Sequence, residues 1–155
     1  MSNTFTIKEV LEQAIQTEKL GYQFYTTICE RFKNEQRLKE LFTTLANKEL
    51  AHEKTFSELL EMVDKKVEDG WYEASLYLRA IVESEFFLGK NKSLPSMEKL
   101  KDIGDAVTYA IGFEKETLLY FYGIRDVVKE KEIVDEIINE EKSHIRWLMS
   151  FKNTL

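Results

Sequence analysis

The chain has 155 residues, 43% hydrophobic and 32% charged, which is enough to bury one core, and we expect a single domain over residues 1–155. A formal net charge of −6 argues against nucleic acid as a partner. One cysteine excludes a disulfide framework, no apolar run is long enough to span a membrane, and the first residues lack signal-peptide features, so we expect a cytoplasmic protein.

Apolar residues recur every three or four positions along most of the chain, which predicts an all-α protein. The five helices are expected over about 6–32, 35–65, 72–88, 97–128 and 132–152. Ser96 is the expected N-cap of the fourth.

The four long helices are expected to form an antiparallel four-helix bundle of two hairpins, over residues 6–65 and 97–152. The second and third long helices then run parallel, so their connection must travel most of the bundle length. A crossover helix over 72–88 rises about 25 Å, which is sufficient. It is rich in aromatic residues, which favours a homodimer contact there: Trp71, Tyr72, Tyr77, Phe86 and Phe87.

A glutamate interrupts the apolar stripe of each long helix. These residues are Glu18, Glu49, Glu114 and Glu141. A carboxylate in a core is costly unless something pairs with it, and almost no lysine or arginine lies on these stripes. The only two histidines, His52 and His144, each follow a glutamate by three residues, which places both side chains on one helix face. The pattern therefore predicts bound metal ions.

The two halves of the chain also resemble each other. The segment Ala14-Ile-Gln-Thr-Glu18-Lys matches Ala110-Ile-Gly-Phe-Glu114-Lys, and in each half a helix with Glu-x-x-His follows. A duplicated hairpin implies pseudo-twofold symmetry. A two-metal centre on that axis is the expected result.

The ordered set Glu, Glu-x-x-His, Glu, Glu-x-x-His resembles the ferritin-like di-iron carboxylate proteins, and within them the rubrerythrin-type branch without a rubredoxin domain. The resemblance implies two iron ions, with manganese or a mixed pair as alternatives. It implies Glu18 and Glu114 as terminal ligands, Glu49 and Glu141 as bridges, and His52 and His144 as caps of one ion each. Tyr25 and Tyr122 match tyrosines near the metals, although each is more readily interpreted as a core aromatic.

The chain also departs from this family. Rubrerythrins usually carry a second glutamate where this chain has Thr117, and an acidic residue where it has His144. The redox-linked iron movement that those carboxylates support is therefore not implied here. The four cysteines of a rubredoxin module are missing, so an external electron donor protein is expected. A ferritin cage is disfavoured, because only eleven residues follow His144.

The resemblance implies a non-haem di-iron oxidoreductase that reduces peroxide or dioxygen. Two alternatives stay open. A ferroxidase or iron-handling protein of the same fold would oxidise iron as cargo. A metal-stabilised interaction module would keep the site without catalysis, and a single Glu-x-x-His pair is by itself compatible with a solvated ion pair.

Overall fold

The computed structural model describes residues 6–63, 71–84 and 97–155. Within these ranges the chain is helical without strands, which confirms the predicted all-α fold. The elements are α1 (Ile7–Arg31), α2 (Gln36–Met62), α3 (Trp71–Ser84), a short 3-10 helix (Met97–Lys99), α4 (Ile103–Val127) and α5 (Lys131–Lys152).

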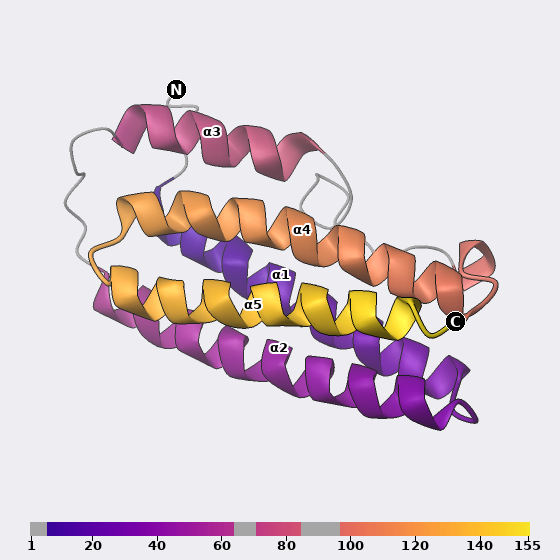
Figure 1. The fold of residues 1–155 in the computed structure, drawn as a ribbon. Coiled ribbons are helices and arrows are strands. Elements are labelled where there is room, and N and C mark those ends of the chain that lie inside the picture. The colour runs from indigo at the N-terminus through magenta and orange to yellow at the C-terminus, as the bar shows by residue number, and fades with distance from the viewer. Residues whose placement is uncertain (1–5, 64–70, 85–96) are drawn as a thin grey trace.

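The long helices form two antiparallel hairpins, α1 with α2 and α4 with α5 (Figure 1). Helices α2 and α4 run in the same direction, and α3 runs back along the outer side of α4. The predicted crossover helix is therefore present over Trp71–Ser84. Its predicted last turn, with Phe86 and Phe87, lies outside the described residues, as does the predicted N-cap Ser96.

Helix α3 packs closely on α4 at Gly123. A Cβ atom on Gly123 would lie 2.5 Å from Cδ2 of Leu78, a side chain that is fully buried between the two helices. Tyr77 donates a hydrogen bond of 3.4 Å to the carbonyl oxygen of Leu119. The glycine thus allows the crossover helix to approach the backbone of α4.

The helix starts follow local capping. Thr6 and Glu9 form a capping box at the start of α1. The prediction of a continuous helix from residue 97 is wrong, because α4 begins only at Ile103. Asp102 has an extended backbone and its side chain accepts a hydrogen bond of 2.9 Å from the Asp105 amide, which fixes the start of the helix there.

The apolar core consists of two clusters, each built from α1, α2, α4 and α5. The first also takes in α3; its large members are Leu11, Phe56, Leu78, Tyr120, Phe121 and Ile138. The second includes Phe24, Tyr25, Phe42, Phe113 and Leu148. Each cluster joins both hairpins. Among the described helices, none is both long and apolar enough to cross a membrane.

Candidate metal centre

Six buried polar side chains lie between the two apolar clusters, and we call them the polar layer. Its members are Glu18 of α1, Glu49 and His52 of α2, Glu114 of α4, and Glu141 and His144 of α5. None is more than 2% exposed. All six were predicted from sequence as metal ligands, and the structure brings them together in the middle of the bundle. Helical spacing explains the arrangement, because each histidine lies one turn after its glutamate on the same face.

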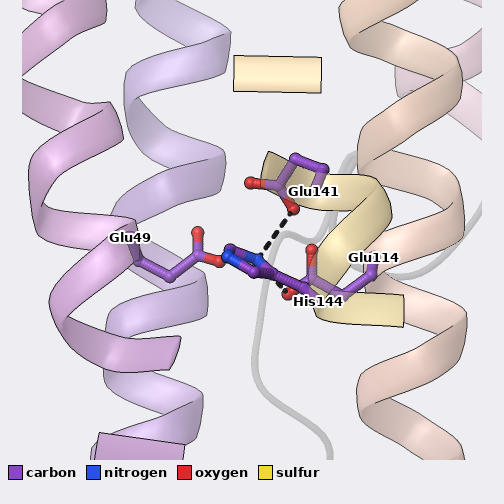
Figure 2. A group of neighbouring side chains, drawn as sticks. All are labelled: Glu49, Glu114, Glu141 and His144. Carbon is purple, nitrogen blue, oxygen red and sulfur yellow. Dashed lines mark ion pairs between the residues drawn. The ribbon is translucent and has the colours of Figure 1, made fainter. Parts of the chain in front are cut away.

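The histidines point their Nδ1 atoms at carboxylates of more than one helix. Nδ1 of His52 lies 2.9 Å from Glu141 and 3.7 Å from Glu18. Nδ1 of His144 lies 3.4 Å from Glu141 and 3.6 Å from Glu114. Figure 2 shows Glu49, Glu114 and Glu141 converging on His144, with the ion pair to Glu141 dashed. The contacts thus link the two hairpins through Glu141.

The ligand atoms form two groups of suitable size for a metal ion. Glu18, His52 and Glu141 each offer one atom to the first group, and all of these atoms lie within 4.8 Å of one another. The second group meets the same limit with Glu49, Glu114, Glu141 and His144. Glu141 belongs to both groups, as a carboxylate between two ions would. This arrangement agrees with two adjacent metal positions.

Most polar atoms of the layer make no hydrogen bond to the described part of the chain. These atoms are both oxygens of Glu18, Glu49 and Glu141, one oxygen of Glu114, Nδ1 of His52 and both nitrogens of His144. Buried polar atoms in folded proteins are almost always paired, and leaving one unpaired costs about 1–3 kcal/mol. Such a concentration of buried donors and acceptors without hydrogen bonds fits metal ions as the missing partners.

Burial and contacts within the layer shift the pKa values of its four carboxyl groups. Burial, together with the charges of neighbouring carboxylates, raises the pKa of Glu49 well above its usual value, and burial likewise raises the pKa of Glu18. Burial and the charge of Glu141 raise the pKa of Glu114 to about 8. Glu141 is the exception: burial would raise its pKa, but its close contacts with Glu114, His144 and His52 outweigh burial and lower it. One carboxylate therefore stays charged while the others resist ionisation.

The two imidazoles shift in the direction expected beside carboxylates. Burial alone would lower their pKa, but the pKa of His52 rises to about 9 through Glu141, and that of His144 rises to about 10 through Glu114 and Glu141. Without metal, the layer therefore holds extra protons. Divalent cations would displace them and take over the neutralisation of the carboxylates.

The structure separates the two tyrosines that the sequence grouped together. The Tyr25 hydroxyl donates a buried hydrogen bond of 2.5 Å to Oε1 of Glu114. Burial and the charge of Glu114 raise the pKa of Tyr25 well above its usual value, so the hydroxyl keeps its proton. Tyr122 instead is 39% exposed, and Lys142 lies over its ring. The described contacts bring only Tyr25 to the polar layer.

One acidic neighbour of the layer was not predicted. Nε2 of His52 is hydrogen-bonded to Oε2 of Glu140 on α5, and Nζ of Lys48 lies 3.6 Å from Oε1 of the same carboxylate. Partial burial would raise the pKa of Glu140, but His52 and Lys48 together lower it. In the sequence, Glu140 directly precedes the predicted ligand Glu141. Helical spacing alone does not show that the Glu140 side chain contacts His52, because His52 lies on another helix.

Comparison with known proteins gives a consistent result. A family model described as rubrerythrin matches residues 9–152. No curated protein matches the chain. The chain is 23% identical in sequence to a candidate ferritin-like diiron-carboxylate protein from Thermotoga maritima, whose crystal structure is known. The two structures superpose with a TM-score of 0.74 over 99% of this chain and 98% of the other, which shows that they share a fold.

Proposed function

The chain belongs to the rubrerythrin family, and we propose that it is a non-haem di-iron oxidoreductase that reduces peroxide or dioxygen at its polar layer. The observation that carries the proposal is the set of four buried glutamates and two buried histidines from four helices, most of whose polar atoms make no hydrogen bond to the described chain. Family membership supports a di-iron protein. The oxidant is our proposal.

The residues fit a pair of divalent ions in number, charge and position. Glu18 and His52 would hold one ion, and Glu114 and His144 the other. Glu141 would contribute to both ions, since it belongs to both groups of ligand atoms. The family resemblance gives Glu49 the same role, and its ligand atom is grouped with those of Glu114, Glu141 and His144. Four carboxylates against two divalent cations give a neutral core. This balance removes the cost of burying the glutamates.

The chemistry of the ligands favours iron or manganese over zinc. Carboxylate and imidazole ligands suit iron or manganese, whereas structural zinc sites are usually tetrahedral and rich in sulfur. The family match points to iron in preference to manganese. We therefore propose two iron ions per chain, and metal analysis of the purified protein distinguishes them from manganese or a mixed pair.

When bound, two iron(II) ions would supply the two electrons that reduction of peroxide to two waters requires. The side chains have supporting roles. Tyr25 holds the Glu114 carboxylate in place by its hydrogen bond, and the apolar clusters on either side restrict water. With one cysteine the chain cannot form a rubredoxin site, so we propose that a separate electron donor protein restores iron(II). A reducing compartment such as the cytoplasm suits this cycle.

The decisive experiment is anaerobic reconstitution with iron(II), followed by addition of hydrogen peroxide or dioxygen in separate samples. We expect two irons per chain, and oxidation of both irons for each peroxide consumed, with the faster oxidant identifying the substrate. Uptake of many irons per chain would instead show an iron-handling protein. Well-folded protein that binds no iron would leave only an interaction module.

We also propose that the exposed side of α3 contributes to a homodimer. Tyr72 is 64% exposed, and Leu76 and Tyr77 are each 44% exposed. Exposed apolar groups of this kind are characteristic of contact surfaces. Sedimentation velocity of the wild type and of a Tyr72→Lys, Leu76→Lys variant tests the proposal: we expect a dimer for the former and a monomer for the latter.

A further inference from the structure

The two histidines of the polar layer differ in the surroundings of their outer nitrogen. Nε2 of His52 is hydrogen-bonded to the Glu140 carboxylate. Nε2 of His144 is buried and has no hydrogen-bond partner in the described chain. The ring centroids of His144 and Trp147 lie 5.5 Å apart. One imidazole is therefore anchored from outside the layer and the other is not.

The difference arises where the internal repeat breaks. Glu140 directly precedes Glu141, and the residue in the matching position before Glu49 is Lys48. Matched halves would give each histidine an acidic neighbour. Here, Lys48 lies instead 3.6 Å from Glu140, at an ion-pair distance. Both of these residues therefore act on the His52 side of the layer.

The hydrogen bond has a direct consequence for metal binding. An imidazole that binds a metal through Nδ1 carries its proton on Nε2. At His52, Glu140 accepts that proton in a hydrogen bond, which fixes the ring orientation and makes Nδ1 a better ligand. At His144, the same N–H would be buried without an acceptor, which is unfavourable. The two metal positions are therefore unequal although their ligand sets are alike.

We propose that Glu140 is a positioning residue for His52 and that the position formed by Glu18, His52 and Glu141 takes up its metal ion first. The position formed by Glu114 and His144 fills second. This inference rests on the proposed metal-binding function of the polar layer. It does not depend on which oxidant the protein reduces.

The presence of only two histidines makes the order of filling directly measurable. Zinc(II), which is diamagnetic, serves as the probe, and imidazole nitrogen-15 NMR follows both rings after assignment with a His144→Gln variant. We expect the first equivalent of zinc(II) to shift Nδ1 of His52 and the second to shift Nδ1 of His144. Before any metal is added, His52 should show a protonated, hydrogen-bonded Nε2.

Variants of Glu140 separate positioning from folding. In Glu140→Ala, affinity for the first zinc(II) should fall about 10–100-fold and the order of filling should be lost. Glu140→Gln retains an oxygen that accepts the same hydrogen bond, so the order should be kept with a smaller loss. Glu136→Ala removes an exposed glutamate one turn earlier on α5 and should behave as wild type.

Two kinds of result would overturn the inference, and they differ in meaning. If His144 shifts first, if both rings shift together in the wild type, or if Glu140→Ala leaves the order intact, the asymmetry is wrong while the metal centre stands. If neither ring responds to zinc(II) and iron(II) also fails to bind, the metal-binding function itself is wrong.

Discussion

Gly21 of α1 lies against the Glu49 carboxylate of α2. A Cβ atom at Gly21 would come within 2.8 Å of Oε2 of Glu49 and 2.9 Å of the Phe113 ring. We predict that Gly21→Ala displaces the carboxylate and lowers stability by about 1–3 kcal/mol, as overpacking does. Iron(II) affinity should fall as well. Calorimetric titration with iron(II) and thermal unfolding measure the two effects.

Gly112 provides the matched control. It lies in the middle of α4 with nothing within 4 Å of an added Cβ atom. Gly112→Ala should therefore stabilise the protein by about 0.5–1 kcal/mol, because alanine favours the helix. Its iron(II) affinity should match that of the wild type. If Gly21→Ala behaved in the same way, the close contact with Glu49 would have no functional role.

Removal of the Tyr25 hydroxyl should weaken the second metal position. In Tyr25→Phe, Oε1 of Glu114 loses its described donor, and a hydrogen bond to a charged group contributes about 1.5–3 kcal/mol. We expect lower affinity for the second metal ion and a lower melting temperature. Tyr122→Phe, at a partly exposed tyrosine of α4, should change neither. Equal effects of the two substitutions would show that the hydrogen bond is unimportant.

The metal-free protein should lose stability as pH rises. In the folded chain, the pKa of Glu114 is about 8, that of His52 about 9 and that of His144 about 10. Each is raised above its ordinary value, so the folded state holds extra protons from pH about 5 to 10, and stability falls across that window. We expect the melting temperature to drop by about 5–10 °C between pH 6 and 9.

Metal should reverse this dependence. Its ligands must be deprotonated, so the metal-induced rise in melting temperature should grow with pH over the same range. Thermal unfolding with and without iron(II), at matched ionic strength and under anaerobic conditions, measures both trends. If the melting temperature of the metal-free protein stays constant or increases from pH 6 to 9, the raised pKa values of Glu114, His52 and His144 are contradicted.

Glu49→Gln should affect the metal-free and loaded proteins in opposite ways. At pH 9, the substitution removes a buried group whose ionisation is unfavourable, so the metal-free variant should be about 1–3 kcal/mol more stable than wild type. It should bind fewer than two metal ions per chain. Glu58→Gln, on an exposed position of the same helix, should alter neither property. A destabilised metal-free variant would contradict the prediction.

Much of this organisation could be predicted from sequence, because helical spacing is a local property. The stripes around Glu18, Glu49, Glu114 and Glu141 placed the four long helices and the polar layer. Spacing also explains the fate of the tyrosines: Tyr25 follows Glu18 by seven residues, about two full turns, and returns to the same face. Tyr122 follows Glu114 by eight, which rotates it about 80° away.

Other features depend on information that spacing does not carry. The start of α4 was missed because residues 97–101 have a helix-compatible composition, and the decisive signal was Asp102 with Asp105 three residues later. The contact of Glu140 with His52 joins helices that are distant in sequence. The role of Gly21 also depends on packing between helices. The absence of a side chain there leaves room for the Glu49 carboxylate of α2, which the sequence of α1 does not reveal.

The division of the core into two apolar clusters affects how ions and small oxidants reach the polar layer. Both clusters include residues of α1, α2, α4 and α5, so packed apolar side chains fill the bundle interior on both sides of the polar layer. The partly exposed Glu140 side chain is hydrogen-bonded to His52, so the polar layer lies close to solvent between α2 and α5. Entry of ions and small oxidants should therefore be limited by transient separation of these two helices, so that fraying of the bundle ends leaves the rates unchanged.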